Sequence, residues 1–292
     1  MVYIEVYRQH REIRQMTEDL DLIFKKIPKC KIKRKKYTLM ALLFSLHIIR
    51  ICLKLPVYFL DPIAVASHRT FFRSDLVTQY LKLPSSPSFI VLQTCELLFV
   101  FMTRFTLSVF VLYYSLTCAY IQVLLQNLIE QLNDVFLCRD LKNLLCVYGD
   151  ISKYMSTMDT KFSFMVFVTV LVNMIGLFWS GYRLAIHSDI SRVYFLSLMT
   201  SGIFYLSHQL TIMSSAASTN EMVNKLKHCA QYLPYRFPKH SQEIKSTLKK
   251  DFMQDYHLTI WKIYEMNRSL IVASLGTLLT YGILIGNLGR EI

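Results

Sequence analysis

The 292-residue chain is poor in charged residues, glycine and proline. Asp, Glu, Lys and Arg make up 18% of it, below the roughly 25% that is typical of soluble domains. The 8 glycines and 7 prolines are too few for a collagen-like or low-complexity chain. Because 53% of the residues are hydrophobic, intrinsic disorder is excluded as well. The composition predicts a polytopic membrane protein built as one hydrophobic bundle.

The chain also lacks the short motifs that carry catalytic chemistry. It contains no HExxH, GxSxG, GxGxxG or Walker-type loop. Its seven cysteines include no CxxC pair, so neither a metal centre nor a disulfide framework is indicated. Residues 1–36 are charged and amphipathic and have no apolar core of a signal peptide. We therefore expect a protein that is not an enzyme and has no metal or other cofactor.

Five stretches are long and apolar enough to cross a bilayer, which takes about 20 residues. Arg50 and Lys54 interrupt the first stretch, and the second contains Glu96 and Arg104. The last three carry no Asp, Glu, Lys or Arg. The five predicted spans are 38–60, a segment within 89–120, 162–181, 193–213 and 269–288.

The basic residues are distributed unequally between the segments that separate these spans. If the N-terminus is cytoplasmic, the inner segments 1–36, 121–161 and 216–262 hold 23 of the 33 Lys and Arg residues, whereas the outer segments hold 6. Lys and Arg collect on the cytoplasmic side of membrane proteins. This distribution predicts an inside N-terminus and an outside C-terminus in the cell membrane, and it explains the net charge of +13 without a nucleic-acid partner.

The inner segments carry helical apolar stripes of their own. After the second span the pattern continues without Gly or Pro, and after a turn at Cys138-Arg139-Asp140 a second stripe leads into the third span. The two stripes are Leu125, Leu128, Leu132 and Val135, and then Leu144, Tyr148, Ile151, Met155 and Met158. Such stripes form either intramolecular packing or a subunit-assembly layer, and the spacing does not decide between them.

Further inner helices are predicted on both sides of Pro234 and Pro238, the second of them running from His240 to Tyr264. The fold class is therefore an all-α, polytopic membrane helix bundle with cytoplasmic helical extensions. The expected division is a cytoplasmic N-terminal segment 1–36, two spans 37–120, a cytoplasmic helical hairpin 121–161, two spans 162–215, cytoplasmic anchor helices 216–267, a last span 268–288 and an outer tail 289–292.

The C-terminal segment resembles the end of arthropod gustatory receptors. In that family the last helix carries Thr-Tyr, five mostly apolar residues and then Gln-Phe. Here Thr280-Tyr281 is followed by five such residues and by Asn287-Leu288. Met266 to Leu270 occupies the place of the family's Leu-Asp-Arg-like turn. The resemblance extends over about residues 20–292 but includes five spans where the family has seven. We expect the first two to be absent, through a wrong start or in a divergent short member.

The resemblance implies a tetrameric, ligand-gated, non-selective cation channel of the plasma membrane whose last helix lines the pore. The implied partners are the lipid bilayer, related receptor subunits in a homo- or hetero-tetramer, and a small-molecule tastant, with no nucleic acid. Small and polar residues on the last span fit a pore, although they also suit close helix packing. The predicted pore-lining residues are Thr277, Thr280, Tyr281, Leu284, Asn287 and Leu288.

A ligand site is expected in the outer half of the bundle, where aromatic side chains and a few polar groups suit small organic molecules. Glu96 and Arg104 lie two turns apart on one helix face, and charges at membrane depth suggest function. The candidate residues are Tyr58, Phe59, Glu96, Phe101, Arg104, Trp179, Tyr182 and Tyr194. The alternatives that stay open are a truncated, non-conducting family member and another polytopic membrane transporter.

Overall fold

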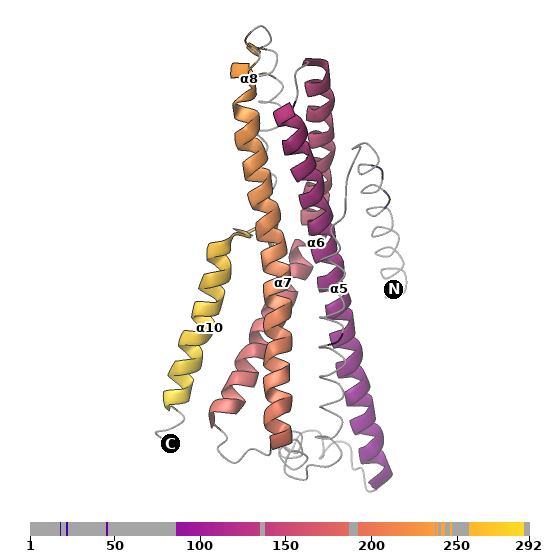
Figure 1. Ribbon diagram of the computed structural model, residues 1–292. Helices are drawn as coiled ribbons and strands as arrows, with labels where there is room; N and C mark the ends of the chain where they lie inside the picture. Colours follow the sequence, from indigo (N-terminus) through magenta and orange to yellow (C-terminus); the bar gives the residue numbers. More distant parts are fainter. Residues whose placement is uncertain are drawn as a thin grey trace. The chain divides into compact units, whose positions relative to one another are not determined.

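The computed structural model describes residues 86–134, 138–186, 192–236 and 257–288, together with the isolated positions 18, 22, 45, 238, 241, 242 and 246. Nearly all of this part is helical (Figure 1). The all-α fold class predicted from the sequence is therefore confirmed. The boundaries of the predicted domain division stay predictions, and the first predicted span at 38–60 lies outside the described ranges apart from Ser45.

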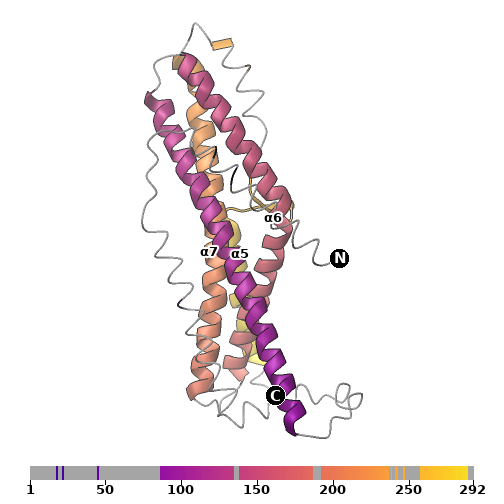
Figure 2. The same ribbon diagram turned by 90° about the vertical axis from the view of Figure 1, so that its right-hand side faces the viewer.

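Two helices are much longer than a bilayer requires. Helices α5 (Ser86–Asp134) and α6 (Cys138–Ile186) each contain 49 residues. At about 1.5 Å per residue each measures roughly 70 Å, against roughly 30 Å for the hydrocarbon core. Figure 2 shows α5 as one uninterrupted helix. The prediction that the second span continues as a single helix is confirmed, and so is the prediction that a helix leads into the third span.

The predicted turn at Cys138-Arg139-Asp140 is wrong by a few residues. All three residues belong to the first turn of α6. Within α5 and α6, the segments Met102–Asn133 and Asn143–Leu184 are long and apolar enough to cross a membrane, judged by length and composition alone.

The next helices are α7 (Arg192–Gln231) and the short α8 (Leu233–Arg236). Tyr232 joins them, and its backbone N–H donates to the Cys229 carbonyl over 3.2 Å. Pro234 lies in the first turn of α8, where the missing N–H of proline costs no helical hydrogen bond.

The segment before the last helix is a β-hairpin, so the predicted helix from His240 to Tyr264 is wrong over its last residues. Strands β1 (Thr259–Ile260) and β2 (Tyr264–Glu265) pair antiparallel, with Thr259 opposite Glu265 and Ile260 opposite Tyr264. Thr, Ile and Tyr prefer strands, and side chains from two other helices bind the hairpin backbone. Helix α10 (Arg268–Leu288) follows it directly.

The chain divides into two compact units. Within the described ranges, unit 1 comprises 115–134, 138–168, 212–236 and 257–271, and unit 2 comprises 86–114, 169–186, 192–211 and 272–288. Helices α5, α6 and α7 each contribute residues to both units. The hairpin and the first turn of α10 belong to unit 1.

The core of unit 1 contains the two predicted stripes. The chain by itself buries nearly all of their described residues, at 2% exposure or less: Leu125, Leu128, Leu132, Tyr148, Ile151, Met155 and Met158. Leu144 is half-buried, and Val135 lies outside the described residues. Hydrogen bonds from Gln122 to the Ser215 carbonyl and the Thr219 hydroxyl, over 3.0 and 3.1 Å, join α5 to α7. Intramolecular packing, rather than a subunit-assembly layer, therefore accounts for the stripes.

Candidate functional site

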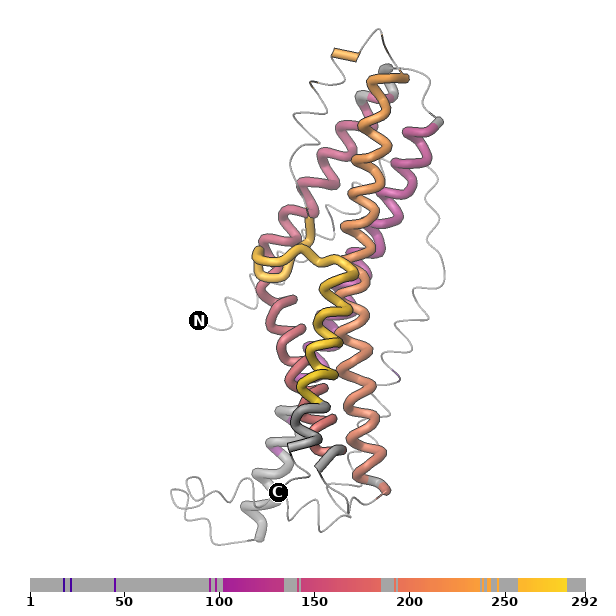
Figure 3. Tube along the Cα trace, turned by 90° about the vertical axis from the view of Figure 1, so that its left-hand side faces the viewer, coloured from indigo at the N-terminus to yellow at the C-terminus, as the bar shows by residue number. Residues whose placement is uncertain are grey.

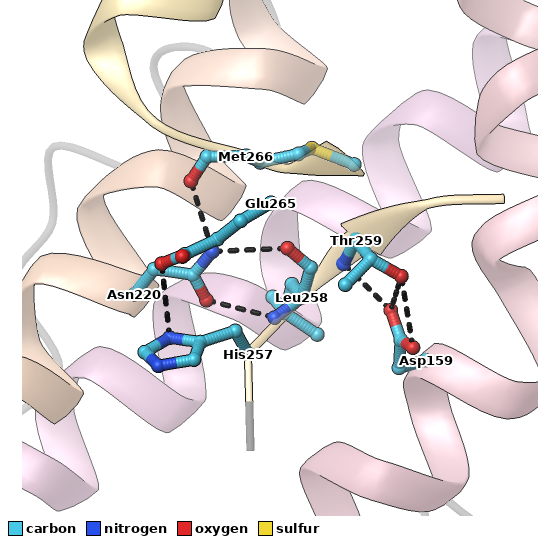
Figure 4. Close-up of polar contacts among 7 residues, drawn as sticks. All are labelled: Asp159, Asn220, His257, Leu258, Thr259, Glu265 and Met266. Carbon is cyan, nitrogen blue, oxygen red and sulfur yellow. Dashed lines mark hydrogen bonds and ion pairs between the residues drawn. The ribbon is translucent and has the colours of Figure 1, made fainter. Parts of the chain in front are cut away.

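The hairpin that precedes α10 is held by one buried side chain of α7. The Nδ2 group of Asn220 donates to the carbonyls of Leu258 and Met266 over 3.0 and 2.9 Å (Figure 4). The Leu258 N–H donates to Asn220 Oδ1 over 2.9 Å. Asn220 is 1% exposed, so these bonds form away from water, where an unpaired backbone group is costly. One asparagine thus fixes the two ends of the hairpin to α7.

Helix α6 binds the other side of the hairpin. The carboxylate of Asp159 accepts the Thr259 N–H over 2.6 Å and the Thr259 hydroxyl over 2.9 Å (Figure 4). One turn further along α6, the carbonyl of Ser163 accepts the Trp261 N–H over 3.3 Å. Figure 3 shows the hairpin reaching α6 before the chain returns to the start of α10. The hairpin therefore connects α6 and α7 within unit 1.

The hairpin turn has an unusual sequence for its backbone. Trp261 and Lys262 have φ angles of 51° and 57°, and the Ile263 N–H donates to the Ile260 carbonyl over 3.0 Å. Two consecutive positive φ angles are typical of type I′ turns, where Asn-Gly is preferred. The left-handed conformation costs a residue with a Cβ roughly 1–2 kcal/mol. The bonds from α6 and α7 offset this cost and hold the turn in place.

Helix α10 begins with a well-defined cap. Asn267 Oδ1 accepts the Leu270 N–H over 2.9 Å and the Ser269 hydroxyl over 2.7 Å, as an N-cap side chain does. The next residue, Arg268, makes two contacts with Glu221 of α7, at 2.5 Å from Nε and 2.7 Å from Nη2. We call residues 257–268 together with Asp159, Asn220 and Glu221 the α10 junction. The family-like turn at Met266 to Leu270 thus forms the start of the last helix.

The ion pair between Arg268 and Glu221 is expected to contribute little to the free energy of unfolding. Both side chains are partly exposed, at 76% and 37%, so solvent screens the interaction. Arg268→Glu is expected to lower the unfolding free energy by about 1 kcal/mol or less. The double variant Glu221→Arg with Arg268→Glu should recover most of the loss. Thermal melting of the detergent-solubilised protein checks both, and an additive effect of the two substitutions would contradict the pairing.

Within unit 2, Arg104 lies over the ring of Tyr205. Its guanidinium carbon is 4.5 Å from the ring centroid, a cation–π geometry that joins α5 to α7. The same ring packs on the bare backbone of Gly176 in α6, since a Cβ added there would lie 2.4 Å from Tyr205 Cζ. Sequence reasoning selected Arg104 but neither of these two partners.

Three of the other predicted ligand residues come together around Arg183, near the end of α6. Trp179 and Tyr182 stack with their centroids 6.0 Å apart, and the Arg183 guanidinium lies 5.0 Å from the Trp179 ring centre. Arg183 also donates a hydrogen bond to the hydroxyl of Tyr194 from α7. Trp179 is exposed, whereas Tyr182 and Tyr194 are half-buried.

The remaining predicted site residues are less completely described. Tyr58 and Phe59 lie outside the described residues, and Glu96 and Phe101 belong to α5 but their side chains are not among those described. The described pore candidates Thr277, Thr280 and Tyr281 are all exposed. Leu284, Asn287 and Leu288 lie in the last two turns of α10, and their side chains are likewise outside the description.

Unit 2 buries polar side chains that sequence reasoning did not select. His208 is 1% exposed, and its Nδ1 lies 2.9 Å from the Phe204 carbonyl and its Nε2 3.0 Å from the Ser108 hydroxyl. Asn173 is fully buried, and neither atom of its amide has a partner in the described part of the chain. Polar groups buried in apolar helices favour a functional site.

The fold and these sites define an all-α membrane protein with long apolar helices and polar groups buried between them. A comparison with known protein families narrows this class. The profile of the family described as 7tm Chemosensory receptor matches residues 1–285, and the chain belongs to that family. The resemblance drawn from its last helix is thereby confirmed at the level of the family. No curated protein matches the sequence.

Proposed function

We propose that this chemosensory receptor is of the gustatory type and opens a non-selective cation path when a small-molecule tastant binds. The observation that carries the proposal is the exposed face of α10. From Arg268 to Gly282 no side chain of this helix is buried in its own chain, although residues 269–288 carry no charge. Such a helix suits contact with other subunits or with water in a pore.

The two faces of α10 differ in chemistry. The half-buried positions are Leu270, Ile271, Ser274, Leu275 and Leu278. Ala273, Gly276, Thr277 and Thr280 form a small exposed face, and the larger Val272 and Leu279 are exposed beside it. The hydroxyls of Thr277 and Thr280 donate to carbonyls one turn earlier, over 2.9 Å in each case. A small, hydroxyl-bearing face is compatible with a wet path and costs little to hydrate.

The ligand site that this proposal requires fits unit 2. Asn173 and Gly176 lie one turn apart on the same face of α6, and Tyr205 covers Gly176. The buried amide of Asn173 has hydrogen-bonding capacity that a small polar ligand would satisfy. Aromatic rings, a guanidinium and a buried amide together suit an uncharged organic molecule with hydroxyl groups.

The proposal includes an orientation and an assembly. The excess of Lys and Arg in 1–36, 121–161 and 216–262 supports a multi-pass protein of the cell membrane with a cytoplasmic N-terminus and an extracellular C-terminus. We propose a homo- or hetero-tetramer with related subunits in which α10 of each chain contributes to the path. In this arrangement the α10 junction lies at the cytoplasmic end of α10.

Cysteine accessibility during current recording tests the proposal. Thr277→Cys and Leu278→Cys are matched neighbours on the exposed and half-buried faces. Cells expressing the chain, with or without a related subunit, are exposed to sugars, bitter compounds and carbon dioxide. A charged, water-borne thiol reagent should reduce the evoked current of Thr277→Cys on the order of tenfold faster than that of Leu278→Cys, because thiol reactivity follows access to water.

The other outcomes decide against parts of the proposal. Equal rates at the two positions would contradict pore lining by the exposed face. Absence of any evoked current, together with a monomer on native gels, would favour a non-conducting member of the family.

A further inference from the structure

The turn of the β-hairpin exposes large apolar side chains. Trp261, Ile263 and Tyr264 are 48%, 63% and 63% exposed, and Lys262 between them is exposed as well. The Trp261 ring packs against α6, with centroid distances of 4.8 Å to Phe167 and 6.0 Å to Phe164. We call residues 261–264 the hairpin tip. It is an apolar surface with one cation at its centre.

The charge of Lys262 is not neutralised by its neighbours. Among the described residues, no carboxylate pairs with its ammonium group. The two nearest acidic residues along the hairpin and α6 are already engaged. Asp159 binds Thr259, and a carboxylate oxygen of Glu265 lies 3.1 Å from His257 Nδ1. The tip therefore presents a positive charge to whatever covers it.

The hairpin lies where charged residues end on the surrounding helices. On α6 no Asp, Glu, Lys or Arg occurs between Lys161 and Arg183, and the hairpin binds α6 between Asp159 and Ser163. On α7 and α10 the uncharged runs end at Glu221 and Arg268, which pair with each other. In a membrane protein such a boundary marks the water–bilayer interface, where Trp and Tyr are enriched.

The backbone supports a role for these particular side chains. Trp261 and Lys262 adopt positive φ, where Asn and Gly are favoured and large side chains are not. Strain of this kind is retained when the structure around it requires the residues that bear it. Packing on Phe164 and Phe167 covers part of the Trp261 ring, and the exposed remainder, together with Lys262, is left for an external contact.

We propose that the hairpin tip is a membrane anchor that lies in the headgroup layer of the cytoplasmic leaflet. Trp261, Ile263 and Tyr264 enter the interface, and Lys262 pairs with the phosphate of an anionic phospholipid. The assignment to the cytoplasmic leaflet rests on the proposed orientation, and that leaflet carries the anionic lipids.

Tryptophan fluorescence tests the location of the tip. The chain has two tryptophans, so Trp179→Phe leaves Trp261 as the only one and Trp261→Phe leaves Trp179. Each full-length variant is reconstituted in vesicles of phosphatidylcholine and phosphatidylserine that carry bromine either near the headgroup or near the chain end. Trp261 should be quenched more strongly by the shallow bromines than by the deep ones.

The charge of Lys262 is tested in the same vesicles. With bromine on phosphatidylserine alone, quenching of Trp261 should report about fivefold enrichment of this lipid over phosphatidylcholine, as expected for one lysine at an anionic surface. Lys262→Gln should remove the enrichment. Lys153→Gln is the matched control, since this exposed lysine lies ten residues before Ser163 on α6, about 15 Å away along the helix and beyond the screening length.

Each result supports or overturns the anchor. Shallow quenching with an enrichment that depends on Lys262 supports it. Quenching of Trp261 by aqueous iodide without lipid quenching overturns it in favour of exposure to water. Protection from both quenchers overturns it in favour of a protein contact, including a second copy. None of these readouts requires an ion current. The membrane anchor can therefore be disproved while the proposed channel is supported, and the channel can be disproved while the anchor is supported.

Discussion

Asn220→Leu is expected to be the most damaging substitution in the α10 junction. It removes the three hydrogen bonds that join Asn220 to Leu258 and Met266 at the two ends of the hairpin. The Leu258 N–H and the Met266 carbonyl lose their partner, at about 1–3 kcal/mol for each buried group left unpaired. The Leu258 carbonyl keeps the Met266 N–H, at 3.1 Å. Thermal melting of the solubilised protein, followed by size-exclusion chromatography, should show a loss of about 2–6 kcal/mol.

Two further variants separate hydrogen bonding from packing. Asn220→Asp has nearly the same shape but places an oxygen where Nδ2 faces two carbonyls, so it should be as damaging as leucine. Asn133→Leu is the control, because its side chain is exposed and only its carbonyl is used, by Arg236 over 3.0 Å. Wild-type melting of Asn220→Leu would show that the junction is held by other contacts.

The junction explains how the start of α10 is positioned. Consecutive residues of α7, Asn220 and Glu221, bind Met266 and Arg268 on either side of the cap residue Asn267. Because Met266 is 1% exposed and its carbonyl is bound, the first turn of α10 cannot shift without breaking buried bonds. In the proposed channel, a movement of α7 would therefore be transmitted to α10 through this point.

The long helices and the core of unit 1 were predictable from sequence because their signals are local. Leu125, Leu128 and Leu132 repeat at helical spacing, and burial of one face follows from that spacing alone. The start of α10 was also accessible, since Asn267 precedes an apolar run and Asn is a favoured cap. The place of the last helix was predicted from the uncharged apolar stretch 269–288.

The hairpin was not predicted because its conformation depends on distant residues. Thr259 is bound by Asp159, and Leu258 by Asn220, residues 100 and 38 positions away. Both polar residues look like solvated positions on long helices when only the sequence is read. The Thr-Ile-Trp-Lys-Ile-Tyr run has the β-branched and aromatic composition of a strand pair, which was the available signal. Likewise, no spacing rule links Arg104 to Tyr205.

Gly176→Ala is expected to disrupt unit 2. The new Cβ would lie 2.4 to 2.6 Å from three ring carbons of Tyr205, closer than non-bonded carbons approach. Tyr205 is 5% exposed, so its ring has little room to move, and a displaced ring loses its contact with Arg104. Overpacking of this kind costs about 1–3 kcal/mol. The measurement is again thermal melting, with ligand-evoked current as a second readout.

The sign of the change in stability distinguishes a local clash at Gly176 from a general intolerance of glycine-to-alanine substitution in α6. An added Cβ at Gly181 has nothing within 4 Å, so Gly181→Ala should gain up to about 1 kcal/mol of helix propensity, whereas Gly176→Ala should lose stability. On a Tyr205→Ala background the clash is absent, and Gly176→Ala should then behave like Gly181→Ala. If Gly176→Ala is still destabilising on the Tyr205→Ala background, a clash with the Tyr205 ring is not the cause of the lost stability. Glycine would then not be needed at position 176 to let Tyr205 of α7 approach α6.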